Sequence, residues 1–138
     1  MAKKIRVLII DEHPAVCEAL AARLGAVPSM QVVGSVYELA EGVNGARLLR
    51  PDIVLLELKR SAEGKCSPAA IIASLLDNGA GRIIILTSYL DEAERDGAFA
   101  AGARRYLLKD IDTGRLVTEI EAVARESWVE QDFRRQTR

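Results

Sequence analysis

The sequence predicts an α/β fold in which a parallel sheet is covered by helices on both faces. Five short runs rich in isoleucine, valine and leucine recur along the chain, and the stretches between them have apolar residues at helical spacing. Strands that alternate with helices are typical of parallel sheets, because right-handed crossovers place the connecting helices on the two faces. We therefore expect a flavodoxin-like, doubly wound (βα)5 sandwich.

The expected strands are identified by their composition and length. Three of the five runs are almost continuously apolar, which is typical of strands buried on both faces of a parallel sheet. We expect strands at residues 5–10, 31–36, 53–58, 83–86 and 105–108.

The expected helices have apolar residues three or four positions apart. The fourth helix, residues 92–101, is the weakest, because Gly97 interrupts it and alanine forms most of its apolar face. The apolar faces of the other four helices are Val16, Ala19, Leu20, Leu24 and Val27; Leu39, Val43, Ala46 and Leu49; Ile71, Ile72, Leu75 and Leu76; and Leu116, Ile120 and Val123.

The composition predicts one domain in the cytoplasm. The chain has 138 residues, of which 49% are hydrophobic and 28% are charged, and its net charge is -1. This balance argues against a nucleic-acid surface that covers the whole domain. No apolar run approaches the roughly 20 residues that span a bilayer. We expect the domain to occupy residues 1–126, and residues 127–138 to form a helix extension, a linker or a tail.

Polar and charged side chains follow four of the expected strands. Asp11 and Glu12 follow the first strand, Glu57 lies at the end of the third, Thr87 follows the fourth and Lys109 follows the fifth. Ligands of doubly wound sheets bind beyond the carboxyl ends of the strands. Paired carboxylates suit Mg2+, although an acidic pair at this place can equally cap the helix that follows.

The single histidine and the two cysteines are assigned no chemical role. His13 stands before Pro14, and this pair indicates the start of a helix, because proline is favoured in the first helical turn. One histidine is too few for a typical zinc site. Cys17 and Cys66 are too few for a disulfide framework, so we expect reduced, inert thiols.

Together these strand ends resemble the receiver domains of bacterial response regulators, over residues 4–124. The stretches that carry the resemblance are the Asp-Glu-His-Pro opening at 11–14, Pro-Asp-Ile-Val-Leu-Leu at 51–56, Leu-Thr-Ser at 86–88 and Gly-Ala-Arg-Arg-Tyr-Leu-Leu-Lys-Asp at 102–110. The first and last of these are most similar to the NarL/FixJ type. The resemblance implies the CheY-like form of the fold, with strand order 2-1-3-4-5.

The resemblance also implies a role for each strand-end residue. In that family an aspartate at the position of Glu57 accepts a phosphoryl group from a histidine kinase, and Mg2+ is held by it and by an acidic pair that corresponds to Asp11 and Glu12. The lysine and the hydroxyl, here Lys109 and Thr87, contact the phosphoryl oxygens. An aromatic side chain, here Tyr106, rotates inward. Members of the NarL/FixJ type usually carry a C-terminal helix-turn-helix domain, so we expect DNA contact only through such a domain, and either a stand-alone receiver or part of a longer regulator.

The chain departs from the family pattern twice. Glu57 replaces the aspartate, and Arg60-Ser61 stands where the family usually has Met-Pro. The extra methylene moves the carboxylate outward by about 1.5 Å. Since phosphoryl transfer depends on positioning, about 1 Å of misplacement can lower the rate about 100-fold. We therefore expect no transfer to Glu57 and no Mg2+ binding, or weak millimolar binding.

These observations favour a pseudo-receiver that is not an enzyme. We expect a signalling domain, from a transcription regulator, that forms a homodimer or binds a protein partner through its fourth helix, fifth strand and fifth helix, without a membrane. We also expect Glu57 to pair with Lys109, without the complete shift of Thr87 and Tyr106. Two alternatives stay open: a receiver phosphorylated on Glu57 or a nearby carboxylate within a phosphorelay, and a flavodoxin-like small-ligand binder. The lack of a glycine-rich phosphate loop argues against the latter.

Overall fold

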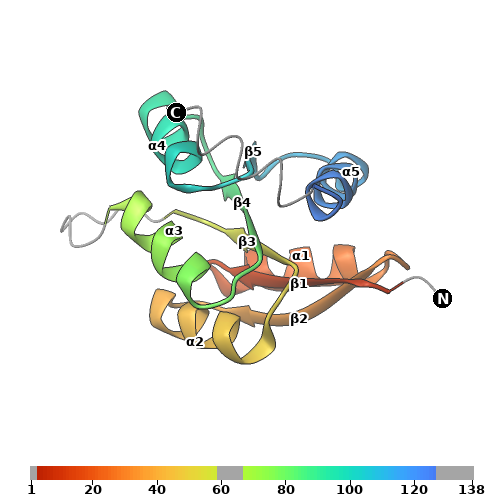
Figure 1. Ribbon diagram of the computed structural model, residues 1–138. Helices are drawn as coiled ribbons and strands as arrows, with labels where there is room; N and C mark the ends of the chain where they lie inside the picture. The colour runs from red at the N-terminus through yellow and green to blue at the C-terminus, as the bar shows by residue number, and fades with distance from the viewer. Residues whose placement is uncertain (1–2, 59–66, 127–138) are drawn as a thin grey trace.

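The protein is a five-stranded parallel sheet with helices on both faces (Figure 1). The computed structural model describes residues 3–58 and 67–126. The strands are β1 (Ile5–Ile10), β2 (Met30–Val36), β3 (Ile53–Leu56), β4 (Arg82–Thr87) and β5 (Arg105–Leu108). The helices are α1 (Pro14–Gly25), α2 (Leu39–Leu49), α3 (Pro68–Asp77), α4 (Glu92–Ala101) and α5 (Thr113–Ala124).

The strand order is β2-β1-β3-β4-β5, and every neighbouring pair is parallel. This order confirms the predicted doubly wound fold. It places β1 and β3 next to each other in the middle of the sheet, so that the residues after these two strands meet at the edge where the carboxyl ends of all strands lie.

Two apolar cores lie on the two faces of the sheet, because successive strand residues point to opposite sides. On β1, Val7 and Ile9 face a core built with α1 and α5, whereas Leu8 and Ile10 face a core built with α2, α3 and α4. All four side chains are buried. The strands β1, β3 and β4 therefore have almost no solvent-exposed face, which explains why their sequences are almost continuously apolar.

A glycine lets α2 lie close to the end of β1. A Cβ atom added at Gly42 would come within 2.6 Å of the Ile10 side chain, so a larger residue there would push the helix away. Ile10 is the last residue of β1 and stands directly before Asp11. Gly42 therefore lets α2 pack directly on the residue that precedes Asp11.

The structure corrects the sequence prediction mainly at the ends of elements. Val27 was assigned to the apolar face of the first helix, but α1 ends at Gly25 and Val27 lies in the following turn. Pro28 follows Val27, and the residue before a proline disfavours helical backbone. β3 ends two residues earlier than expected, at Leu56. Arg60-Ser61, Cys66 and the extension at residues 127–138 lie outside the described residues.

Candidate functional site

The backbone brings Asp11, Glu57 and Lys109 to one place at the carboxyl edge of the sheet. Each follows a strand directly or closely, and each is held by a backbone bond to a neighbouring strand. Asp11 donates its N–H to the Val36 carbonyl at 3.0 Å, Glu57 to the Ile10 carbonyl at 3.0 Å, and Lys109 to the Thr87 carbonyl at 2.7 Å. The three side chains therefore start from a rigid sheet.

The Lys109 ammonium lies between two carboxylates. Lys109 Nζ is 2.6 Å from Asp11 Oδ2 and 2.7 Å from Glu57 Oε1. The three side chains are 16%, 4% and 13% exposed, respectively, so solvent screens the ion pairs only weakly. The distance from Glu57 to Lys109 confirms the pairing that we predicted from the sequence.

On each of the two carboxylates, His13 contacts the oxygen that Lys109 does not contact. Its Nδ1 is 2.9 Å from Asp11 Oδ1 and 3.2 Å from Glu57 Oε2, and its backbone N–H donates to Asp11 Oδ1 at 2.9 Å. The expectation that His13 only marks a helix start was incomplete. His13 is indeed the residue before α1, but its ring is also part of the site. Its place two residues after Asp11 was the available signal.

Glu12 lies at the margin of this cluster. Its carboxylate is 38% exposed and is 4.0 Å from His13 Nε2. In the described part of the chain, the acidic and histidine side chains that lie close enough to share one ion are Asp11, His13 and Glu57. The structure therefore brings together Asp11 and Glu57 as expected, but with His13 in the place that we expected for Glu12.

The pKa values of the Asp11 and Glu57 carboxyl groups are shifted in opposite directions from their ordinary values. Burial raises the pKa of Asp11 most, but hydrogen bonds with Glu57, Lys109 and His13 lower it by more in total, so that it lies below its ordinary value. Burial, followed by the neighbouring Asp11 carboxyl, raises the pKa of Glu57 above its ordinary value, against the effect of Lys109. Asp11 is thus the firmly ionised acid of the pair, and Glu57 is the acid that protonates first.

The same acids raise the pKa values of two basic side chains, Lys109 and His13. Burial lowers the pKa of Lys109, but the contacts with Asp11 and Glu57 outweigh it, and the net pKa is raised. The pKa of His13 is also raised, chiefly by its hydrogen bond to Asp11 and by the Glu57 charge. With His13 protonated, two positive charges balance two negative charges at this edge of the sheet.

Thr87 and Tyr106 lie in the fold as expected but bond elsewhere. The Thr87 hydroxyl is buried and donates to the Tyr89 carbonyl at 3.1 Å. The half-buried Tyr106 donates its hydroxyl to the Glu94 carboxylate in the first turn of α4. Burial, followed by Glu94, raises the pKa of Tyr106 to about 12. Among the described residues, no hydrogen bond joins Thr87 to Glu57, so the Thr87 part of the predicted incomplete shift is confirmed, and the orientation of Tyr106 stays a prediction.

The residues present do not fit Mg2+ in this arrangement. Mg2+ requires near-octahedral oxygen ligands at about 2.0–2.1 Å. Asp11 and Glu57 each direct one oxygen to Lys109 and the other to His13, and the third potential ligand of the cluster is an imidazole nitrogen. A Mg2+ ion would have to displace Lys109 or His13 from at least one carboxylate oxygen.

Comparison with protein families identifies this architecture. The model of the response regulator receiver domain matches residues 7–121. The chain belongs to the response regulator receiver family. This receiver has the strand order β2-β1-β3-β4-β5 and a glutamate at position 57.

The similar curated proteins include transcription regulators. The receiver is 36% identical over 122 residues to the transcriptional regulatory protein LiaR of Bacillus subtilis, which covers 88% of this chain and 56% of LiaR. It is 29% identical over 119 residues to the DNA-binding transcriptional activator DevR/DosR of Mycobacterium tuberculosis, covering 86% of this chain and 54% of that protein. The receiver spans about half the length of these relatives.

Solved structures show the same fold. The signal receiver domain of the response regulator NarL from Mycobacterium tuberculosis superposes with a TM-score of 0.79 at 24% identity, and covers 91% of this chain and 100% of that one. A two-component response regulator of the LuxR family from Aurantimonas sp. SI85-9A1 gives 0.76 at 30% identity, and covers 88% of this chain and 86% of that one. In the described ranges of this receiver, no helix has the length and hydrophobicity needed to cross a membrane.

Proposed function

We propose that this receiver works in transcription regulation as a protein-interaction domain that does not depend on phosphorylation of an aspartate. The observation that supports this proposal is the position of Glu57. Its carboxylate is engaged on one oxygen by Lys109 at 2.7 Å and on the other by His13 at 3.2 Å. An acceptor needs a free, in-line oxygen, whereas each of the two oxygens here already contacts a basic side chain.

Glu57 is a partial substitute for a phosphoryl group. It places a carboxylate against Lys109, but it supplies one charge where a phosphoryl group supplies about 1.5 to 2. It also lacks a third oxygen that could reach Thr87. In the resting state that we infer, Lys109 neutralises the acceptor position, and Thr87 and Tyr106 keep their hydrogen bonds to Tyr89 and Glu94. A protein partner or a small ligand would then control the domain.

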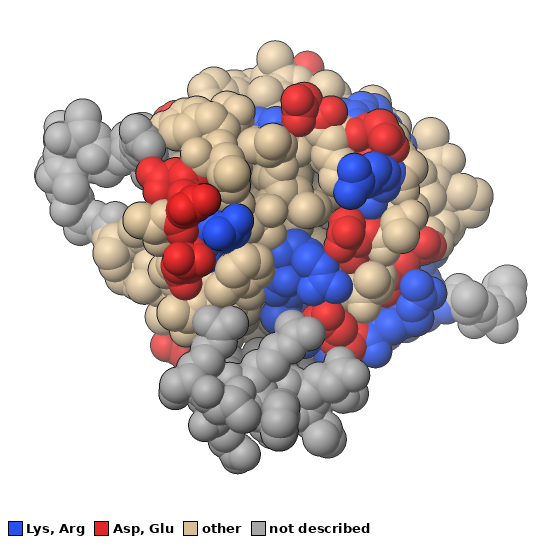
Figure 2. Space-filling model, turned by 90° about the horizontal axis from the view of Figure 1, so that it is seen from above, with Lys and Arg blue, Asp and Glu red and all other residues tan. Residues whose placement is uncertain are grey.

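The surface formed by α4, β5 and α5 is the proposed contact with a second copy or another protein. Figure 2 views the molecule from the side on which these elements lie in Figure 1, and acidic and basic side chains are interspersed across it. Leu108, at the end of the edge strand β5, is 39% exposed. An exposed leucine on an edge strand among charged side chains suits a modest, polar interface.

Incubation with acetyl phosphate and Mg2+, followed by intact-mass measurement, tests the absence of acceptor chemistry. We expect no added phosphoryl group on the wild type, and no enzymatic turnover of the donor. Glu57→Asp is the positive variant, because it shortens the side chain away from Lys109 and His13. It is expected to gain labelling, together with a Mg2+ affinity at least about tenfold higher, since a shorter carboxylate leaves space for the ion.

A phosphoryl group on unmodified Glu57, or on a neighbouring carboxylate, would favour the alternative of a phosphorylatable receiver. If Glu57→Asp also stays unlabelled, the second departure from the family pattern is tested by Arg60→Met combined with Ser61→Pro. Labelling of this triple variant would show that Arg60 and Ser61 also prevent phosphoryl transfer.

The interface is tested by sedimentation of two matched leucine variants. Leu108→Glu places a charge on the proposed surface, whereas Leu48→Glu places the same charge on α2, where Leu48 is 79% exposed. We expect Leu108→Glu to shift the population toward the monomer and Leu48→Glu to behave as the wild type, because an unpaired charge in an interface weakens association. Equal behaviour of the two variants would contradict the assignment.

A further inference from the structure

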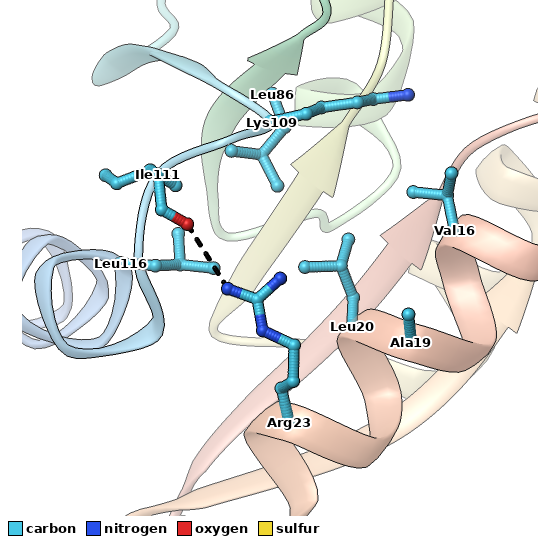
Figure 3. Close-up of a pocket in the computed structure, with 8 residues that line it drawn as sticks. All are labelled: Val16, Ala19, Leu20, Arg23, Leu86, Lys109, Ile111 and Leu116. Carbon is cyan, nitrogen blue, oxygen red and sulfur yellow. Dashed lines mark hydrogen bonds between the residues drawn. The ribbon is translucent and has the colours of Figure 1, made fainter.

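A hollow lies between α1 and the chain that leads from β5 into α5 (Figure 3). Its volume is about 200 Å³. The lining side chains come from α1, from the end of β4 and from the segment between Lys109 and Leu116, and are Val16, Ala19, Leu20, Arg23, Leu86, Lys109, Ile111 and Leu116. The hollow is therefore built by three elements of the rigid fold.

Most of the lining is apolar, and its deepest members belong to the core. Leu20, Leu86 and Leu116 are 6%, 3% and 1% exposed. Their packing in the core beside α1 and α5 fixes the shape of the hollow independently of any ligand. A preformed apolar hollow favours a compact apolar group, which would lose contact with water on entering it.

Arg23 supplies the polar group of the hollow. In Figure 3 its guanidinium points from α1 toward Ile111 and Leu116. Nε donates to Thr113 Oγ1 at 2.7 Å and Nη2 donates to the Ile111 carbonyl at 3.2 Å. Among the described residues, Nη1 has no hydrogen bond or ion pair. The guanidinium is thus held in place by two neutral acceptors, and its charge is not neutralised by a carboxylate.

Lys109 contributes to the hollow differently. Its ammonium points away from the other lining residues in Figure 3 and is paired with Asp11 and Glu57. Its methylene groups form part of the wall. The cation available to an anion in this hollow is therefore Arg23.

The size of the hollow sets the size of the ligand. A cavity of about 150 Å³ lined by aliphatic and aromatic side chains holds one benzene molecule. The present volume of about 200 Å³ accommodates a ring of that size together with one carboxylate.

We propose that this hollow binds a small apolar or aromatic carboxylate of about the size of benzoate. The apolar body lies among Leu20, Leu86 and Leu116, and the carboxylate accepts a hydrogen bond from Arg23 Nη1. The binding claim is independent of whether Glu57 accepts a phosphoryl group. Such a ligand would pack on the Lys109 methylenes, and so would touch the residue that pairs with Glu57.

The test is an NMR titration of the full 138-residue chain with sodium benzoate, followed by backbone amide shifts. We expect saturable shifts at residues 16–23 and 109–116. Benzamide, which has the same shape without the charge, is expected to bind at least about tenfold more weakly, because a charge-assisted hydrogen bond is lost. Arg23→Gln is expected to weaken benzoate binding by a similar factor, while Arg47→Gln on α2 leaves it unchanged.

The apolar part is tested by filling the hollow. Ala19→Leu is expected to weaken benzoate binding at least about tenfold, because the added methyl groups occupy the space of the ring. Ala22→Leu is its control, since Ala22 is exposed on α1 and does not line the hollow.

If no saturable shifts appear at benzoate concentrations up to about 20 mM, the proposal is overturned, because a Kd above that concentration is too weak for a useful ligand site. Equal affinity for benzoate and benzamide would also overturn it, and would indicate an apolar side chain of a partner protein as the occupant. The comparison of the two compounds uses the unmodified chain, so it decides the matter even if Arg23→Gln fails to fold.

Discussion

The two halves of the strand-end site differ in where their side chains bond. In the acid half, defined by Asp11, Glu57 and Lys109, side chains from the ends of three different strands bond to one another. In the hydroxyl half, defined by Thr87 and Tyr106, neither side chain bonds to the three acid-half residues. Thr87 donates to the Tyr89 carbonyl, two residues later, and Tyr106 donates to the Glu94 carboxylate in α4. The side chains of the acid half therefore form ion pairs with one another, whereas those of the hydroxyl half form hydrogen bonds to α4 and to the loop before it.

This difference shows how far the Glu57 carboxylate reaches into the site. The longer side chain carries its carboxylate to 2.7 Å from the Lys109 amine. Among the described residues, the same carboxylate makes no hydrogen bond to Thr87, whose hydroxyl already donates to the Tyr89 carbonyl. A charge at the acceptor position thus satisfies the lysine without recruiting the hydroxyl.

The largest effect is expected from removing the shared cation. Lys109→Met keeps most of the side-chain volume but leaves Asp11 and Glu57 without their common partner, and the two acids would then repel each other. We expect a loss of about 2–4 kcal/mol in the free energy of unfolding, since removing one partner of a buried ion pair leaves an uncompensated charge. Urea unfolding at neutral pH measures this loss.

The control for that change is the same substitution at an exposed site. Lys4→Met, before β1, is expected to alter stability by less than about 0.5 kcal/mol. Adding Glu57→Gln to Lys109→Met should recover part of the loss, because it removes one of the two stranded charges. If the double variant is no more stable than Lys109→Met, repulsion between Asp11 and Glu57 is not the cause of the loss.

A smaller effect is expected from breaking the hydroxyl half. Tyr106→Phe removes the hydrogen bond to Glu94 and should lower stability by about 0.5–1.5 kcal/mol. Combined with Glu57→Gln, its effect should add to within about 0.5 kcal/mol, as for sites that share no partner. A larger coupling energy in this double-mutant cycle would show that the two halves communicate in the resting state.

The smallest effect is expected from the pH dependence of His13, which is the only histidine in the chain. Its folded pKa is raised above 6.5 by Asp11 and Glu57. A raised histidine pKa stabilises the fold below the unfolded pKa, and this contribution is lost as pH rises through the folded value. Stability should therefore fall slightly as the pH rises from about 6.5, the ordinary histidine value, through the raised folded pKa of His13.

His13→Gln provides the matched comparison for the pH series. It should flatten the change in the urea midpoint over the same pH range, and Glu57→Gln should lower the NMR titration midpoint of His13 in the otherwise unchanged chain. A His13 midpoint at or below 6.5 in the wild type would contradict the contacts of its ring with the two acids.

Sequence reasoning predicted the fold because the signals were redundant. Val7 to Ile10, Val54 to Leu56 and Ile83 to Leu86 are buried on both faces of the sheet, so their apolar runs identified strands without ambiguity. The end of the first helix was predicted less well, because Val27 keeps the helical period and packs on the core from a turn. Periodicity does not distinguish these two placements.

The sequence predicted the site residues that follow strands better than those in the turn into α1. Asp11, Glu57 and Lys109 follow strands, and the parallel sheet brings strand ends together. His13 and Glu12 are not on strands, so their side-chain directions depend on how the backbone turns into α1. The extended backbone at His13 turns its ring toward Asp11 and Glu57, whereas the adjacent Glu12 remains more exposed.

The most direct test of the central claim is a crystal structure of the chain grown at neutral pH in the presence of Mg2+. The account predicts a Glu57 carboxylate oxygen within about 2.7–3.2 Å of Lys109 Nζ, as for a charge-assisted hydrogen bond, with the Thr87 hydroxyl still on the Tyr89 carbonyl. A separation beyond about 4 Å, the limit of an ion-pair contact, would contradict the pairing. A Mg2+ ion held by Asp11 and Glu57, with Thr87 bonded to Glu57, would contradict the separation of the two halves.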